Sequence, residues 1–321
     1  ITIRNDILSL ETSIIETRRD IHQHPELAFN EVRTANLVAT RLRTLGIDVE
    51  EKVGKTGVVG RLHGDKPGPE IALRADMDAL PMQEIGDIPY RSVNDGVMHA
   101  CGHDGHTAML LGAAEALFAA KDELHGTVRF IFQPAEEGYH GAKFMLEDGA
   151  LQGVEEIYGL HLWNYQPYGT VGVQAGPVMA CSDSFDITIT GVGGHGAAPQ
   201  GTVDAVVVSA HLITSLQTIV SRNNNPLESA VVSIGQINGG HNFNIIADKV
   251  ELKGTARSYT TENQELIIKQ MNQIISGIAQ TFGASIELDY RKGYPATINA
   301  PAPTEKTRIA AQKIAGDGVM S

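Results

Sequence analysis

The sequence predicts an α/β protein in which a domain built on a mostly parallel sheet carries an inserted ferredoxin-like module of order β-α-β-β-α-β. Three observations predict this architecture. The length of 321 residues suits two domains better than one. Short β-rich segments alternate with helical ones over residues 58–160, and after Ser182 the order of elements changes to that of the module.

The larger domain is expected to open with helices. Charged and apolar residues are mixed at helical spacing from Thr2 to about His22. A second helix is predicted between an Asn30 cap and Gly46, because these apolar residues share one face: Val32, Ala35, Val38, Leu42 and Leu45. Strands are predicted at 58–62, 71–75, 128–132 and 157–160, with a helix at 107–120. This alternation favours parallel strands.

The inserted module is expected to begin with a strand at 185–189, where apolar and polar residues alternate. The remaining predicted elements are a helix at 203–220, strands at 230–237 and 248–257, an amphipathic helix at 262–282 and a strand at 285–290. We therefore expect the larger domain to comprise residues 1–180 and 294–321, and the inserted domain to comprise residues 181–293.

The composition favours a small-molecule partner. A formal charge of -13 and a pI of about 5.3 disfavour nucleic acid and anionic membranes, because both select basic patches. The longest apolar run, at 107–120, contains Glu115 and is too short to span a bilayer. The two cysteines, Cys101 and Cys181, do not form the pattern of a disulfide-stapled secreted protein. We expect a cytoplasmic protein.

A dense group of metal-ligating residue types occupies residues 99–106. It combines three imidazoles, one thiol and one carboxylate: His99, Cys101, His103, Asp104 and His106. Thiolate and imidazole are good ligands for zinc and related metals, and the Cys-x-His spacing lets one loop present both groups to one ion. The alternative is a buried thiol beside solvated or capping histidines.

Two adjacent carboxylates, Glu136 and Glu137, come just after the strand predicted at 128–132. Open α/β sheets place ligand sites at the carboxyl ends of their strands. One glutamate is then expected to bind metal while its neighbour transfers protons. Metal-assisted hydrolysis requires both of these roles. The alternative is a helix N-terminus, which favours acidic residues.

Further candidate groups follow two other predicted strands. His161 follows the strand at 157–160, where a lone histidine is usually structural. Asp76 and Asp78 follow the strand at 71–75, where they are expected to orient ligand imidazoles as hydrogen-bond acceptors. Turn formation before Pro81 explains the two aspartates equally well.

Four strings of residues together resemble the aminoacylase-like metallopeptidase family, and more narrowly its hippurate hydrolase and auxin-conjugate hydrolase branch. They are Arg74-Ala-Asp-Met-Asp-Ala-Leu-Pro81, His99-Ala-Cys-Gly-His-Asp-Gly-His-Thr107, Phe132-Gln-Pro-Ala-Glu-Glu-Gly138 and Gly193-Gly-His-Gly-Ala-Ala-Pro199. The resemblance runs from about His22 to Asn299. It implies a zinc-aminopeptidase-like catalytic domain and an inserted lid and dimerisation domain.

The resemblance also implies the roles of the candidate residues. Two divalent metal ions would be bound by four residues: Cys101, His103, Glu137 and His161. Glu136 would be the general base and acid, taking a proton from a metal-bridging water and delivering it to the departing amine. The thiolate favours zinc, and manganese, nickel and cobalt stay open.

Residues of the inserted domain are implied to contact the substrate of a homodimer. His195 resembles the histidine that reaches the neighbouring subunit's site and stabilises the oxyanion. Asn242 or Asn244, and Arg257, resemble positions that hold the substrate carboxylate. Without the family, His195 is better explained as a turn residue and Arg257 as a surface residue. The family also has a further metal-binding histidine in a final segment, so we expect the natural chain to continue past Ser321.

The sequence therefore predicts a metal-dependent amidohydrolase whose substrate is a dipeptide or an N-acyl-amino acid carrying an acetyl, benzoyl or similar group. One alternative is a cysteine hydrolase in which Cys101 is the nucleophile and His103 or His161 the base. The other alternative is a relative that binds peptide or metal without turnover.

Overall fold

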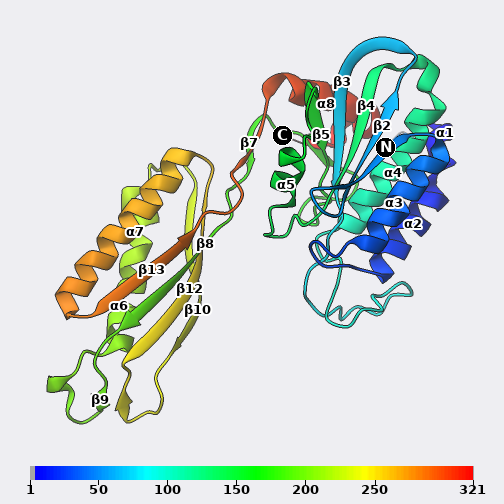
Figure 1. Ribbon diagram of the computed structural model, residues 1–321. Coiled ribbons are helices and arrows are strands. Elements are labelled where there is room, and N and C mark those ends of the chain that lie inside the picture. Colours follow the sequence, from blue (N-terminus) through cyan, green and yellow to red (C-terminus); the bar gives the residue numbers. More distant parts are fainter. Residues whose placement is uncertain (1–3, 321) are drawn as a thin grey trace. The chain divides into compact units, whose positions relative to one another are not determined.

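The computed structural model describes residues 4–320, so that the predicted helical start at Thr2 and the end of the chain at Ser321 lie outside the described residues. The chain forms two compact units (Figure 1). The first unit contains the chain up to Gly172 together with Ile309–Met320, and the second contains Val173–Arg308.

The first unit is built on a mixed five-stranded sheet of order β1-β2-β4-β3-β5. Its strands are β1 (Asp48–Val53), β2 (Gly57–His63), β3 (Lys66–Asp76), β4 (His125–Gln133) and β5 (Glu156–Gly159). β3 pairs parallel with β4 and β5, whereas β2 pairs antiparallel with β1 and β4. The prediction of an α/β fold is confirmed, and the sheet is mixed because β2 runs opposite to its other four strands.

The antiparallel half of the sheet arises from a short turn that the sequence pattern did not reveal. β1 is rich in charged residues and reads poorly as a strand. It is joined to β2 by residues 54–56, in which Gly54 and Lys55 have positive φ values of 63° and 80°. So short a connection can join only antiparallel neighbours, because parallel strands require a long crossover.

Helices cover both faces of this sheet (Figure 1). Along β4, Phe130 and Phe132 face the core beneath α3 (Val32–Leu45) and α4 (His103–Ala119), whereas Ile131 faces Met145 of α5 (Gly141–Glu147). The alternation of faces follows from the two-residue period of a strand. The remaining helical segments of this part of the chain are α1 (Asn5–Leu8), α2 (Glu11–Gln23), α8 (Pro301–Ala315), which continues from the second unit, and the 3-10 turns Lys121–Glu123 and Gly316–Gly318.

The start of α3 differs from its prediction. Asn30 does not cap the helix, and its side chain donates instead to the carbonyl of Ala28. The carboxylate of Glu26 performs the capping function, since it accepts hydrogen bonds from the backbone N–H groups of Arg33 and Thr34 at 2.9 and 2.8 Å. The predicted end at Gly46 is confirmed, and Gly46 has the left-handed φ of 85° that favours glycine.

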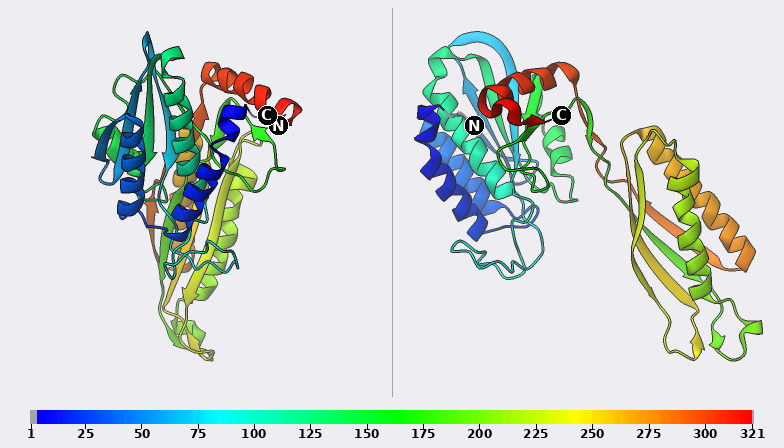
Figure 2. Two further views of the ribbon diagram at one scale, coloured as in Figure 1. Left: turned by 90° about the vertical axis from the view of Figure 1, so that its right-hand side faces the viewer. Right: turned by 180° about the vertical axis from the view of Figure 1, so that it is seen from behind.

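The second unit contains an antiparallel sheet of order β10-β12-β8-β13, with α6 (Ala205–Thr218) and α7 (Thr261–Phe282) on one face (Figure 2). Its strands are β8 (Asp183–Thr190), β10 (Ala230–Gly239), β12 (Lys249–Ser258) and β13 (Ser285–Arg291). The elements predicted over residues 185–290 are confirmed to within two residues. Small ribbons pair β9 (Gly194–His195) with β11 (Ile245–Ile246), β7 (Gly176–Met179) with β14 (Thr297–Asn299), and β6 (Val171–Gly172) with β15 (Val319–Met320).

One helical segment, Ala205–Asn223, is long and apolar enough to cross a membrane. Its buried residues pack into the core of the second unit against the sheet: Ala205, Val208, Leu212, Leu216 and Ile219. Length and composition are weak support for a membrane span, because the core helix of a globular domain passes the same test.

Candidate metal and catalytic site

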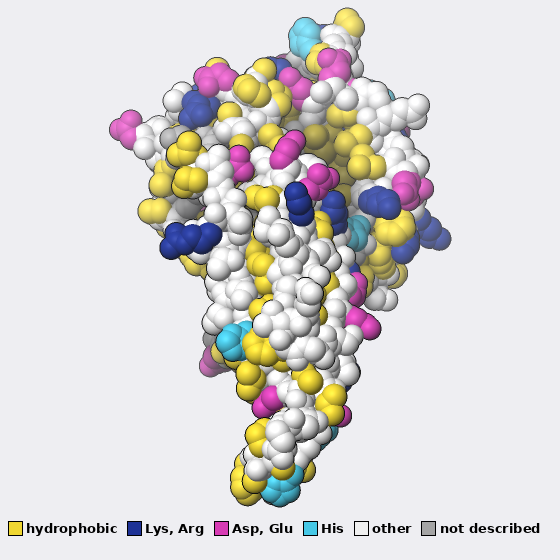
Figure 3. All heavy atoms as spheres, turned by 90° about the vertical axis from the view of Figure 1, so that its left-hand side faces the viewer, with side chains coloured by type: hydrophobic (Ala, Val, Ile, Leu, Met, Phe, Trp, Pro, Cys, Tyr) yellow, Lys and Arg dark blue, Asp and Glu magenta, His cyan; other side chains and the backbone are white. Residues whose placement is uncertain are grey.

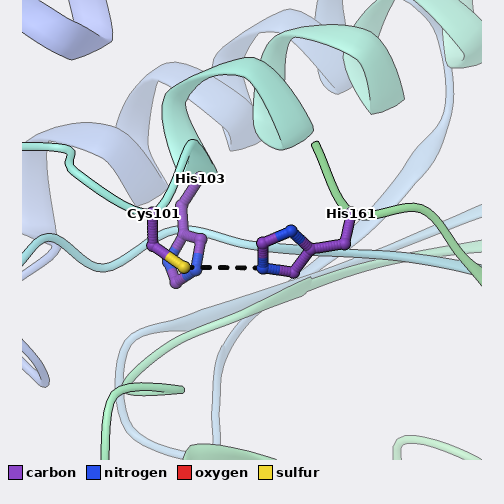
Figure 4. A group of neighbouring side chains, drawn as sticks. All are labelled: Cys101, His103 and His161. Carbon is purple, nitrogen blue, oxygen red and sulfur yellow. Dashed lines mark hydrogen bonds between the residues drawn. The ribbon is translucent and has the colours of Figure 1, made fainter. Parts of the chain in front are cut away.

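Three predicted ligands converge at the N-terminus of α4. Cys101 and His103 flank Gly102, whose left-handed φ of 87° turns the chain into the helix. His161 follows β5, and its ring faces the other two side chains (Figure 4). The sulfur of Cys101 lies 3.4 Å from Nε2 of His161. One potential ligand atom from each residue lies within 4.8 Å of the others, which is the arrangement that a metal ion requires.

Glu136 and Glu137 follow β4, on the loop that lies between β4 and α5. The carboxylate of Asp78 accepts hydrogen bonds from their backbone N–H groups at 2.9 and 3.0 Å. His103, Glu136 and Glu137 form a second group of potential ligand atoms within 4.8 Å of one another. His103 belongs to both groups, so the donor atoms form one continuous cluster.

Two buried atoms at this place lack hydrogen-bond partners. Nε2 of His103 and Oε1 of Glu137 are buried, 3.9 Å apart, and make no hydrogen bond to the described residues. Buried polar groups are normally satisfied, so an unsatisfied pair calls for a missing ligand. One imidazole nitrogen and one carboxylate oxygen facing the same point are suitable donors for a divalent cation.

His103 is oriented for this role through its other nitrogen. Its Nδ1 donates to the backbone carbonyl of Asp78 at 2.7 Å, which leaves Nε2 free to bind metal. Burial lowers the pKa of His103, but the contacts with Asp78 and Cys101 and the charge of Asp76 outweigh burial and raise it to about 11. The acidic surroundings therefore favour a cation at this place, and a bound metal ion would replace the proton on Nε2.

His106 plays a structural role that sequence reasoning did not assign. Its Nδ1 bonds to Oδ1 of Asp76 at 2.6 Å, and its Nε2 accepts a hydrogen bond from the backbone N–H of Leu162 at 2.8 Å. Both ring nitrogens are thus occupied, although His106 lies close to Asp76 and His103. His106 links the end of β3 to the loop that carries His161. Asp76 also accepts a hydrogen bond from Arg74 at 2.6 Å.

The local electrostatics distinguish Glu136 from Cys101. Burial, followed by the charges of Glu137 and Asp76, raises the pKa of Glu136 above its usual value. Contact with His103 lowers the pKa of the Cys101 thiol, but burial and the Glu137 charge outweigh that contact and the net direction is upward. Glu136 is therefore suited to exchanging protons, whereas the thiol is not activated as a nucleophile.

A buried polar cluster behind the α4 N-terminus has no counterpart in the sequence prediction. His22 of α2 bonds to Asp104 at 2.9 Å and to Glu84 at 3.2 Å. Arg18 also donates to Asp104, at 3.0 Å. These contacts anchor the first turn of α4 to α2. His99 lies beside this cluster, and both of its ring nitrogens are buried without partners among the described residues.

Burial lowers the pKa of His99 to about 4, from 6.5. The folded state therefore favours the neutral ring. Its stability is full above pH 6.5 and falls as the pH drops from 6.5 to about 4, where protonation of the unfolded state is favoured over that of the folded state. Between pH 7 and 4 the chelator-treated protein is expected to lose about 3 kcal/mol of unfolding free energy through His99. Urea unfolding of wild type and His99→Leu at both pH values measures this loss.

His125 is an exposed histidine and serves as the control. His125→Gln is expected to follow the pH dependence of the wild type, whereas His99→Leu is expected to lose about 3 kcal/mol less. Equal pH dependence of wild type and His99→Leu would show that His99 is not the group concerned.

The predicted substrate-binding residues lie in the second unit. His195 of β9 is exposed and pairs with Ile245 of β11, and the carbonyl of Asn244 accepts a hydrogen bond from Gly196. Asn242 is also exposed and bonds to the N–H of Phe243. The structure therefore brings His195, Asn242 and Asn244 together on one small ribbon.

Arg257 lies apart from that ribbon, near the opposite end of β12. It is half-buried, and its guanidinium donates to the backbone carbonyls of Asp183 and Ala256. These bonds leave the other guanidinium nitrogens without a hydrogen bond to the described residues.

Comparison with known proteins agrees with this site. The model of peptidase family M20/M25/M40 matches residues 72–321. An N-acyl-L-amino acid amidohydrolase of Geobacillus stearothermophilus is 43% identical over 92% of this chain and 80% of its own length. A hippurate hydrolase of Campylobacter jejuni is 42% identical over 97% of this chain and 82% of its own. The structure of a dinuclear metal-binding M20 peptidase from Bacillus subtilis superposes with a TM-score of 0.81 at 38% identity, covering 95% of this chain and 80% of that one.

Proposed function

The chain belongs to peptidase family M20/M25/M40, and from that membership we propose that it hydrolyses the amide bond of N-acyl-amino acids with the help of two divalent metal ions. It is a hydrolase, as its relatives are. The observation that carries the proposal is the buried pair of unsatisfied atoms, His103 Nε2 and Glu137 Oε1, beside the carboxylate of Glu136.

The metal ions would be held by four residues: Cys101, His103, Glu137 and His161. When bound, a pair of divalent cations polarises the amide carbonyl and lowers the pKa of a nearby water molecule. Zinc is the first candidate because a thiolate and two imidazoles are its preferred ligands. Manganese, nickel and cobalt accept the same donor set, and availability influences which metal is bound.

Glu136 is proposed to carry the proton. Its backbone is fixed by Asp78, while its carboxylate makes no hydrogen bond to any residue of the described chain. The raised pKa allows it to accept a proton from the attacking water and release it to the departing amine. Asp76 and Asp78 support the site by holding His106, His103 and the Glu136–Glu137 backbone.

We further propose that residues 181–293 form a ferredoxin-like lid and dimerisation domain, inserted between catalytic segments 1–180 and 294–321. Its His195 would stabilise the oxyanion in the partner's site, and Asn242 or Asn244 together with Arg257 would hold the substrate carboxylate. Figure 3 shows hydrophobic and histidine side chains at the end of this unit that carries β9, where Phe243 is 99% exposed. An exposed apolar group beside His195 suits contact with a substrate or a second subunit. The protein would act as a cytoplasmic homodimer.

The test is release of free amino acids from a panel of N-acetyl and N-benzoyl amino acids, with and without a strong chelator. Release is expected, and chelation is expected to abolish it until zinc or manganese is added back. Release that resists the chelator but stops after thiol alkylation would instead identify Cys101 as the nucleophile. A folded, metal-loaded protein that releases nothing would indicate a relative that binds without turnover.

A further inference from the structure

Glu31 is a buried carboxylate with no part in the mechanism described so far. Its side chain has no solvent exposure, although the residue lies in the loop before α3. Oε1 accepts a hydrogen bond from the backbone N–H of Ala135 at 2.8 Å, and Oε2 accepts one from the hydroxyl of Thr56 at 2.6 Å. Ala135 immediately precedes Glu136 in the loop between β4 and α5, residues 134–140, which we call the catalytic loop. Glu31 therefore contacts the catalytic loop from 104 positions away in the chain.

The loop that Glu31 contacts is held in an unfavourable backbone conformation. Ala135 has a φ of 51°, in the left-handed region that a residue with a Cβ atom rarely adopts. Such a conformation persists only where surrounding contacts determine it. Here two carboxylates accept hydrogen bonds from three successive backbone N–H groups. Glu31 accepts from Ala135, and Asp78 accepts from Glu136 and Glu137.

Glu31 is itself held in place by the turn between β1 and β2. Thr56, its hydroxyl partner, belongs to this turn. The adjacent Lys55 ammonium lies over the rings of Phe29 and Phe144, at 3.8 and 4.2 Å from their centroids. Gly57, which follows this turn as the first residue of β2, packs closely on the catalytic loop, since a Cβ atom added to it would lie 3.0 Å from the Pro134 side chain. The carboxylate therefore has little freedom to move away from Ala135.

We propose that Glu31 is a positioning residue which, by fixing the left-handed turn at Ala135, sets the directions in which Glu136 and Glu137 project. The proposal rests on the proposed amide hydrolysis for its kinetic consequence. A misplacement of about 1 Å in a catalytic group lowers the rate on the order of 100-fold. Because Glu137 is a proposed metal ligand, its misplacement is also expected to weaken metal binding.

The chain offers a matched control in Glu26. Its carboxylate also binds backbone N–H groups, those of Arg33 and Thr34, but it does not bond to the catalytic loop. Glu26→Ala and Glu31→Ala should both destabilise the fold. Only Glu31→Ala should change the chemistry, so the pair separates positioning from general stability.

The experiment compares wild type, Glu31→Ala, Glu31→Gln and Glu26→Ala at a temperature at which all four are folded. Glu31→Ala is expected to lower kcat about 100-fold while KM changes less than about 3-fold, and to raise the Kd for zinc at least about 10-fold. Glu31→Gln is expected to recover kcat to within about 10-fold of wild type, since its amide oxygen can accept from Ala135 and its amide nitrogen can donate to Thr56. If Glu31→Ala does not fold, Glu31→Asp replaces it. The shorter aspartate side chain is also expected to lose the hydrogen bond from the Ala135 N–H.

The proposal is overturned if kcat and the zinc Kd of Glu31→Ala, or of Glu31→Asp in its place, match those of Glu26→Ala. Failure of Glu31→Gln to improve on Glu31→Ala also overturns it. If wild type hydrolyses no N-acyl-amino acid, the proposed function fails. The zinc Kd of the variants then tests by itself whether Glu31 is a positioning residue. An unchanged zinc Kd in that case removes Glu31 as a positioning residue.

Discussion

Glu136→Gln is expected to lower kcat about 1000-fold while both metal ions remain bound. The glutamine keeps the backbone N–H that donates to Asp78 and keeps the size of the side chain, but it cannot accept and release a proton. Turnover of an N-acyl-amino acid, measured together with metal content per subunit by elemental analysis, checks both parts of this expectation.

Glu137→Gln is the comparison variant for this experiment. It changes the neighbouring carboxylate, whose Oε1 faces His103, and is expected to lose metal as well as activity. If Glu136→Gln retained turnover near that of wild type, Glu136 would have no place in proton transfer. Loss of metal from Glu136→Gln would mean that Glu136 is a ligand and not the free base.

His103→Ala is expected to weaken metal binding more than 100-fold and to abolish amide hydrolysis. The outer partners of a metal site typically contribute 10- to 100-fold in affinity. A residue that belongs to both groups of donor atoms and has a buried, unpartnered Nε2 should contribute more. Isothermal titration of the chelator-treated protein with zinc or manganese measures the change.

His106→Ala provides the contrast, because both ring nitrogens of His106 are already bonded, to Asp76 and to Leu162. It is expected to lower the stability of the fold and to weaken metal binding less than 100-fold through movement of the loop that carries His161. If His106→Ala lost metal as completely as His103→Ala, His106 would itself be a ligand, and the ligand set would have to be redrawn.

The elements with strong periodicity could be predicted from the sequence. The amphipathic pattern of α7 predicts a helix and the alternating pattern of β8 predicts a strand, because each element buries one face and that face carries apolar residues. β1 could not be predicted in this way, since four of its six residues are charged and it lies at the edge of the sheet. The sheet is mixed because β2 runs antiparallel both to this edge strand and to β4.

The candidate ligands could be predicted because their residue types cluster along the chain, as with Cys101 and His103. The supporting residues could not, because their partners are distant in sequence. Glu31 reads locally as a helix cap, and His22 as one polar residue of α2. Their roles depend on tertiary contacts with Ala135 and Asp104, which no local pattern records.

Asp78 joins the two halves of the candidate metal site within one amino acid. Its carbonyl group binds His103, and its carboxylate binds the backbone of Glu136 and Glu137. The span between these attachment points is set by covalent bonds, which are far stiffer than the packing of α4 against the sheet. Thermal displacement of β3 relative to its neighbours should therefore carry the imidazole and the glutamate pair in the same direction, and the spacing between ligands should fluctuate less than the elements that bear them.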